Sequence, residues 1–171
     1  MVMVSPRNLI VIILAVALTA VLAFYFIGRD ERQILRRQRD LVERLSKSGP
    51  EKEIGALTRA QEISSFFNDE VVLDLKPYLS GAHGRRDLAG LAYHFRGMVE
   101  ELSIEMADHK LTIAPDRRTA VLVAVARAKA KYSGEWDQDL REVEMRWAKT
   151  EKGWLISSAS FTSAIKRPEG L

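Results

Sequence analysis

The spacing of apolar residues changes near Leu102, and this change limits the possible folds more than any other feature. From Arg85 to Leu102, apolar residues recur every three or four positions, as on one face of a helix. Beyond that point they alternate with a period of two in four segments, 103–114, 118–132, 137–150 and 154–163. The sequence therefore predicts an α+β fold with about three helices packed on a curved antiparallel sheet.

Two further helices are expected upstream of this change. The first, 30–47, carries Ile34, Leu41 and Leu45 on one stripe and pairs of arginine and acid at i, i+4 on the opposite face. The second covers 51–67. A short strand over 71–75 and a glycine-rich loop over 80–84 lead into the third helix.

The strand segments carry more detailed predictions. Apolar residues switch phase between Met106 and Leu111, which predicts a β-bulge. One face of 120–130 is almost entirely alanine, which leaves room for a ligand or for a closely packed helix. We expect the core to contain residues of the third helix packed on the third strand segment, namely Leu91, Phe95, Met98 and Val99 against Val143, Met145 or Trp147.

The N-terminal segment from Leu9 to Ile27 contains 19 residues and no charged side chain. It is long enough to cross a bilayer as a helix, so we expect a single-pass membrane anchor over residues 1–28 and one domain over 29–171. A cleaved signal peptide, with a cleavage site after Ala23, is the alternative. Because the apolar run continues past that site, the anchor is favoured.

The positive charge of the chain is concentrated beside this segment. Residues 29–47 hold seven Lys/Arg and four acids, whereas residues 48–171 hold 18 Lys/Arg and 19 acids. A nucleic-acid-binding domain would carry the charge on its folded surface, so that class is set aside. The charged helix face is either solvated or in contact with anionic lipid headgroups.

Two short stretches carry a resemblance to a known fold. His83-Gly84-Arg85-Arg86-Asp87-Leu88 resembles the entry into the third helix of nuclear transport factor 2-like proteins, which are also called SnoaL-like or cystatin-like. Val143–Trp147 followed by Lys152–Ile156 is similar to their closing hairpin. The resemblance implies a cone-like domain. Members include isomerases, polyketide cyclases, dehydratases, transport factors and membrane-anchored secretion subunits, and the N-terminal segment resembles the last group most.

That last resemblance favours a bacterial inner-membrane protein whose domain faces the periplasm. Counting charges beside the apolar segment favours the cytoplasm instead. Long C-terminal domains translocate largely regardless of charge, which weakens the count. We therefore expect the exported orientation.

No motif in the chain identifies a reaction. Enzymes of this fold place an Asp, His or Tyr inside the cone, and the candidates here are His94, Asp74 and Tyr78, with weaker ones at His83, His109, Tyr132 and Asp137. The three histidines lack metal-ligand spacing, the chain has no cysteine, and no cofactor motif is present. We expect no metal, no cofactor and no catalytic residue.

The leading functional hypothesis is a membrane-tethered, non-catalytic interaction domain of an envelope assembly. It would dimerise or bind a protein partner through the open face of its sheet, with Trp136, Trp154 and Phe161 as anchors. The alternative is a small-molecule-binding domain, or an isomerase- or cyclase-type enzyme, that takes a small apolar ligand in the cone. An open apolar cavity with a convergent Asp, His or Tyr would favour this alternative.

Overall fold

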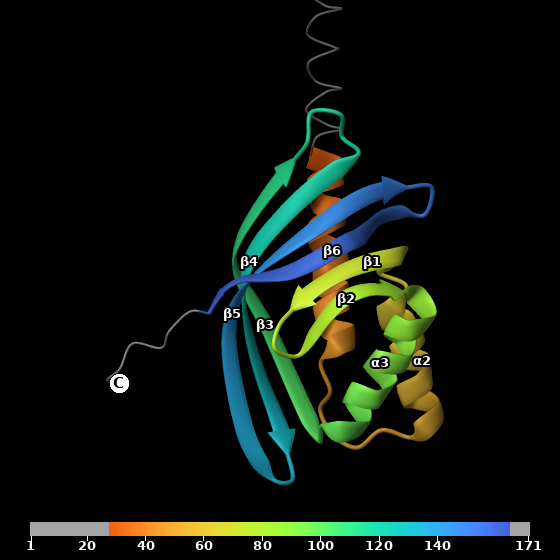
Figure 1. The fold of residues 1–171 in the computed structure, drawn as a ribbon, viewed down its shortest axis with the longest axis vertical. Coiled ribbons are helices and arrows are strands. Elements are labelled where there is room, and N and C mark those ends of the chain that lie inside the picture. The colour runs from red at the N-terminus through yellow and green to blue at the C-terminus, as the bar shows by residue number, and fades with distance from the viewer. Residues whose placement is uncertain (1–27, 165–171) are drawn as a thin grey trace, which may run out of the picture.

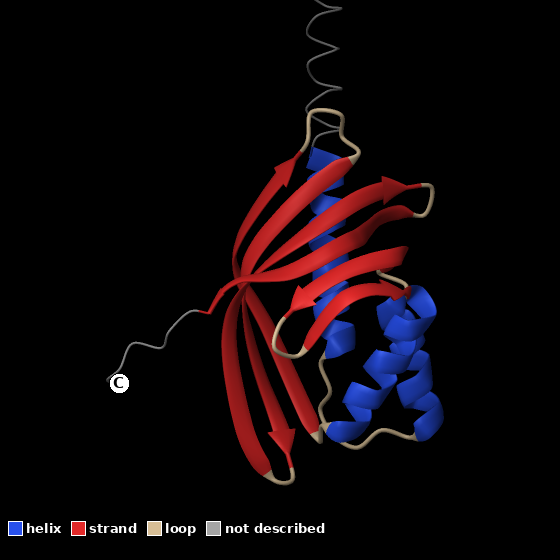
Figure 2. Ribbon diagram, in the orientation of Figure 1, coloured by secondary structure: helices blue, strands red, loops and turns tan. Residues whose placement is uncertain are grey.

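The computed structural model describes residues 28–164, in which three helices gather on one side of a strongly curved six-stranded sheet (Figures 1 and 2). The helices are 28–45, α2 (Glu53–Ser64) and α3 (Arg85–Met98). The strands are β1 (Phe67–Leu75), β2 (Leu79–Gly84), β3 (Glu101–Ile113), β4 (Thr119–Tyr132), β5 (Glu135–Thr150) and β6 (Gly153–Ala164). The predicted α+β architecture is therefore confirmed.

The sheet is mixed, and this corrects the antiparallel prediction. Its order is β2-β1-β6-β5-β4-β3, and β1 runs parallel to β6 while every other neighbouring pair is antiparallel. The predicted loop 80–84 is in fact strand β2, which pairs with β1 through its whole length. Alternation within each segment does not reveal the parallel pairing, because β1 and β6 come from distant parts of the chain. Strand β2 was missed because its two glycines are typical of a turn.

The predicted bulge in β3 is present. The pairing of β3 with β4 shifts between Ala107 and Lys110, and Asp108 adopts a positive φ of 52° there. A bulge bends its strand and increases the local twist. It therefore contributes to the curvature that gives the sheet an inner face, toward the helices, and an outer face.

The core lies between helix 28–45 and the upper part of the inner face. Ile34, Leu122, Trp147, Trp154 and Ile156 are all fully buried there. Directly paired positions place the alanine row of β4 on the same inner face as Val143, Met145 and Trp147 of β5. The prediction that these β5 residues share a face, and belong to the core, is confirmed.

The predicted contribution of α3 to this core is mostly wrong. Leu91, Phe95 and Met98 are 39%, 38% and 53% exposed, whereas Val99 is buried in a separate cluster with Leu102 and Ala130. The helix packs chiefly on α2, β1 and β2. It buries Leu88 while its apolar stripe stays only partly covered.

A reciprocal pair of polar contacts holds α3 to helix 28–45. The buried Arg96 side chain donates from Nη1 to the carbonyl oxygens of Arg44 and Leu45 at 2.9 Å each, at the C-terminal end of helix 28–45. Lys47 Nζ in turn donates to the carbonyl oxygens of Arg96 and Val99. Each cation thus satisfies carbonyls that a helix end leaves unpaired. We call these two residues the helix clasp.

The expected anchor from Leu9 to Ile27 lies outside the described residues. Within 28–164, no helix has the length and apolar character needed to cross a membrane. The anchor and the orientation of the domain therefore stay predictions.

Candidate functional site

The inner face of the sheet is uncovered between its two apolar clusters. The main cluster reaches down to Ala126, and the small cluster of Val99, Leu102 and Ala130 closes the lower end. Between them the pairing of β4 with β5 places Ala128 beside Asp139, next to the Ala126–Arg141 pair. All four of these residues are partly exposed. We call Ala126 and Ala128 the alanine floor.

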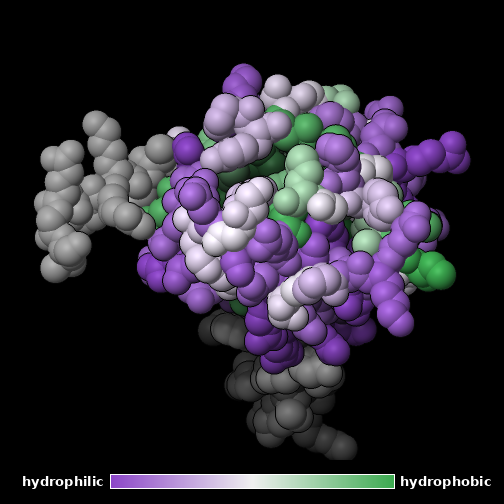
Figure 3. Space-filling model, turned by 90° about the horizontal axis from the view of Figure 1, so that it is seen from below, coloured by the Kyte–Doolittle hydropathy of each residue, from purple (hydrophilic) through white to green (hydrophobic). Residues whose placement is uncertain are grey.

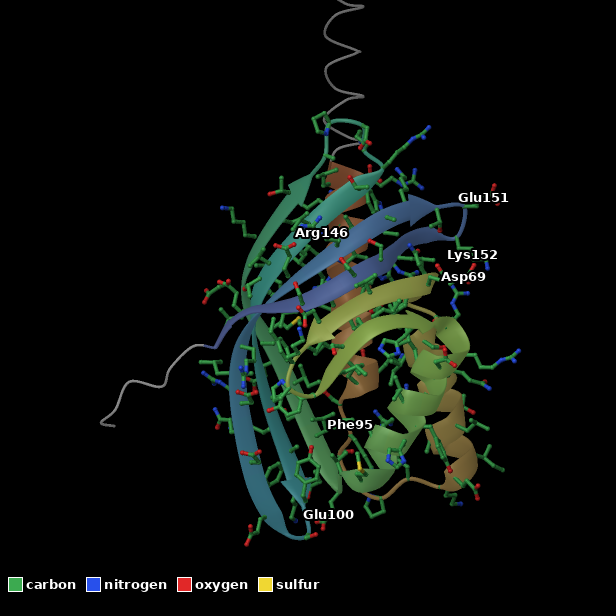
Figure 4. All side chains as sticks on the ribbon, viewed as in Figure 1. Asp69, Phe95, Glu100, Arg146, Glu151 and Lys152 are labelled. Carbon is green, nitrogen blue, oxygen red and sulfur yellow. The ribbon has the colours of Figure 1, made fainter. Side chains whose placement is uncertain are left out.

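Apolar side chains surround the alanine floor. Phe95 lies on the side of α3 toward β3 (Figure 4), and Phe161 of β6 lies opposite Val143 of β5. Seen from below, hydrophobic atoms lie recessed behind a hydrophilic rim (Figure 3). Ala126, Ala128 and Phe161 are partly exposed and Phe95 is exposed, so this apolar surface is accessible to water.

A polar cluster stands at one side of the floor. The turn between β1 and β2 carries Tyr78, whose hydroxyl donates to Asp139 Oδ2 at 3.1 Å. Arg141 Nε donates to both oxygens of the same carboxylate, at 3.1 and 2.9 Å. Phe161 lies beneath this cluster: its ring centroid is 6.4 Å from that of Tyr78 and 5.7 Å from the Arg141 guanidinium carbon.

The pKa values of the two acid–base groups in this cluster, Asp139 and Tyr78, are both shifted away from neutral pH. Burial opposes ionisation of Asp139, but hydrogen bonds from Arg141 and Tyr78 outweigh it and lower the pKa of the carboxyl. Partial desolvation, and then the nearby carboxylate, raise the pKa of Tyr78. Because Tyr78 is 67% exposed, its desolvation is limited, and the Asp139 carboxylate is the better supported of the two causes. At neutral pH the cluster is therefore a carboxylate held by a cation and a neutral phenol.

Of the residues proposed from sequence, only Tyr78 lies in this cluster. Asp74 is exposed and pairs with Lys76 at 3.3 Å. His94 is exposed and lines a groove of about 760 Å³ between α3 and the segment after Lys47. The weaker candidates are also elsewhere or exposed: His83 is on β2, His109 lies at the β3 bulge, and Tyr132 and Asp137 are exposed near the β4–β5 turn.

The three proposed interface aromatics differ in exposure. Trp154 is fully buried, and its indole N–H donates to Asp30 at 3.3 Å, so it offers no surface to a partner. Phe161 is partly buried in the core and supports the polar cluster. Trp136 is 58% exposed, beside Lys131 on the outer face.

Sequence reasoning missed Asp139 and Arg141 as site residues, and it also missed the buried polar residue Gln38. Asp139 and Arg141 continue the inward-facing positions of Val143 and Met145, so two charges on an apolar alternation were the available signal. Gln38 is buried beside Met106, and its side-chain oxygen has no hydrogen-bond partner among the described residues. It interrupts the stripe of Ile34 and Leu41 in the same way.

Comparison with known proteins identifies the fold. The sequence matches no protein-family model and no curated protein. The structure is similar to the Kfla4162 protein from Kribbella flavida, with a TM-score of 0.68, 14% identity, and coverage of 81% of this chain and 93% of that one.

Two structures from Novosphingobium aromaticivorans are also similar, each with a TM-score of 0.61. A nuclear transport factor 2-like protein with a cystatin-like fold is 15% identical, over 94% of this chain and 90% of that one. A putative scytalone dehydratase is 13% identical, over 79% and 84%. At these identities the comparison shows the fold alone: the domain has the nuclear transport factor 2-like, cystatin-like fold that its sequence resembles.

Proposed function

We propose that the alanine floor binds a small, largely apolar molecule that carries a hydroxyl or carbonyl group. The observation that carries this proposal is the partial exposure of Phe95, which lies on the side of α3 toward β3, together with the partial exposure of Ala126 and Ala128 (Figure 4). Phe95 belongs to the most regular apolar stripe of the chain, yet it is 38% exposed. A small set of polar groups at the edge of an apolar surface is the usual composition of a ligand site.

The polar cluster supplies the recognition group. Asp139 accepts hydrogen bonds, Arg141 donates them, and the exposed Tyr78 hydroxyl can do both. A ligand hydroxyl or carbonyl at this edge would thus meet a partner of either kind. The putative scytalone dehydratase among the similar structures bears a name that implies a small-molecule substrate, which agrees with this use of the fold.

The pKa shifts favour binding over acid–base catalysis. A general base works best when its pKa lies near the operating pH. Asp139 is shifted downward and Tyr78 upward, so neither is tuned toward neutrality. We therefore propose a binding role, and not an isomerase or cyclase activity, for this site.

The interaction role expected from sequence is the second candidate. Its support within the described residues is now Trp136, since Trp154 is buried and Phe161 serves the inner face. Oligomeric state in sedimentation is the test for it. An exposed ring on the outer face would not compete with a ligand on the inner face, so the two roles are compatible.

Calorimetric titration with 2-naphthol and with naphthalene tests the binding proposal. Ala128→Leu should abolish binding of both by filling the floor. Ala107→Leu is the matched control, because Ala107 is exposed and pairs with Val125 on the outer face. Asp139→Asn should weaken the binding of 2-naphthol and leave the binding of naphthalene unchanged. Equal binding by the two leucine variants would refute the assignment.

A further inference from the structure

The seven cations of residues 29–47 fall into two groups in the structure. Three of them have partners inside the domain. Arg37 lies over the Phe66 ring, Arg44 pairs with Glu62, and Lys47 belongs to the helix clasp. The remaining four are Arg29, Arg32, Arg36 and Arg39, and none makes an ion pair or hydrogen bond with any part of residues 28–164.

These four arginines occupy one exposed face of helix 28–45. Their spacing of three, four and three residues places them within one narrow arc of a helix with 3.6 residues per turn. All four are exposed, and they line a groove of about 630 Å³ that His109 of β3 borders. We call these five residues the arginine face. Glu43, one turn beyond Arg39, marks its end.

The four arginines are not neutralised by ion pairs within their own helix. The sequence predicted local pairs of Arg36 with Asp40 and of Arg39 with Glu43, which would neutralise the face. Within the described residues neither ion pair forms. The same face also carries Asp40 and Glu43, so four arginines against two acids leave a net charge of +2, which attracts an anionic surface.

We propose that the arginine face docks on the anionic phospholipid headgroups of a membrane. The position of the face selects this partner. The 19 uncharged residues from Leu9 to Ile27 end immediately before helix 28–45, so any contact of that segment with a bilayer brings the arginines to the headgroups. Residues 48–171 are close to neutral, unlike the broad basic surface that nucleic acid requires.

The test uses the full chain and a single fluorescent label. The chain has no cysteine, so Gln33→Cys places one polarity-sensitive dye in the groove of the arginine face. Gln138→Cys gives a control label near the β4–β5 turn, at the far end of the domain (Figure 1). The protein is added to vesicles of phosphatidylcholine, with or without phosphatidylserine as roughly a third of the lipid.

Emission from position 33 should shift further to the blue in vesicles with phosphatidylserine than in neutral ones, and emission from position 138 should not differ between the two. Each cation near an anionic surface strengthens binding about fivefold, so changing all four arginines to Gln should raise the lipid concentration for the half-maximal shift by about a hundredfold or more. The four-lysine version should keep the shift, because a headgroup surface requires charge and not the arginine fork.

A control variant removes the same charge elsewhere. Lys52, Arg86, Lys129 and Lys152 are exposed and make no side-chain ion pair among the described residues, so changing them to Gln should leave the shift intact. An equal shift in neutral vesicles, or in the variant that lacks the four arginines, overturns the proposal. A shift produced by duplex DNA in place of vesicles overturns the choice of partner. Thermal melting of each variant shows that the fold is retained.

Discussion

Replacing Arg96 by Ala should cost the domain about 3–5 kcal/mol of unfolding free energy. The side chain is 2% exposed and donates to Glu51 Oε2 at 3.0 Å as well as to two carbonyls of helix 28–45. Its removal leaves a partly buried carboxylate and those carbonyls without their donor. Each unsatisfied buried group costs about 1–3 kcal/mol, less where water can enter, which brings the sum into the stated range.

Urea unfolding followed by tryptophan fluorescence measures this cost, because Trp147 and Trp154 are fully buried reporters. The same change should lower the melting temperature by about 10–20 °C for a domain of this size. Arg86→Ala is the control: Arg86 is exposed in the first turn of the same helix and should stay within about 0.5 kcal/mol of the parent. A loss below about 1 kcal/mol for Arg96→Ala would refute the helix clasp as a stabilising element.

The pH dependence of this loss gives an independent check. The Arg96 hydrogen bond, against the opposing effect of burial, lowers the pKa of Glu51 in the folded state. A lowered carboxyl pKa stabilises the fold above the unfolded value of about 4.3, and this contribution disappears as pH falls through the folded value. The difference in unfolding free energy between the parent and the Arg96→Ala variant should therefore become smaller below about pH 4.

Three further predictions concern other residues. Asp30→Asn should destabilise the fold by about 1–3 kcal/mol in urea unfolding, because Asp30 accepts from Lys149, Arg117 and buried Trp154; a neutral result would show these contacts to be dispensable. Phe95→Ala should cost less than about 1 kcal/mol, against ~3–5 for a fully buried Phe, and a larger loss would mean that α3 covers the floor. Arg141→Gln should raise the pKa of Asp139 in an NMR titration; an unchanged value would remove Arg141 as the cause of the shift.

Local patterns in the sequence predicted the elements well because each pattern reports on one segment. The bulge in β3 followed from a phase switch, and the shared face of Val143, Met145 and Trp147 followed from alternation. The parallel pairing of β1 with β6 had no such signal, because it joins residues 86 to 89 positions apart. Backbone hydrogen bonds between the two strands determine this pairing, and they do not change the apolar periodicity of either strand.

The candidate site was harder to predict for a related reason. Tyr78 was proposed as a polar residue of the cone, but its partner Asp139 lies 61 positions away in the sequence. Histidine, the usual acid–base group, drew attention to His94, which the fold places on an exposed side of α3. The useful signals were charges at inward-facing positions: Arg96 on a helix stripe, and Asp139 and Arg141 on a strand.

The helix clasp also explains why the alanine floor can remain open. An amphipathic helix normally gains its stability by burying its apolar stripe, which would press Phe95 onto the alanines. Here Arg96 and Lys47 tie α3 to helix 28–45, and Val99 fixes its last turn against Ala130. Because polar contacts at one end hold the helix in place, its stripe need not be buried by the protein itself. Stability and an open apolar surface then come from different residues, so Arg96→Ala should lower stability while Ala128→Leu should remove only the surface that a ligand would cover.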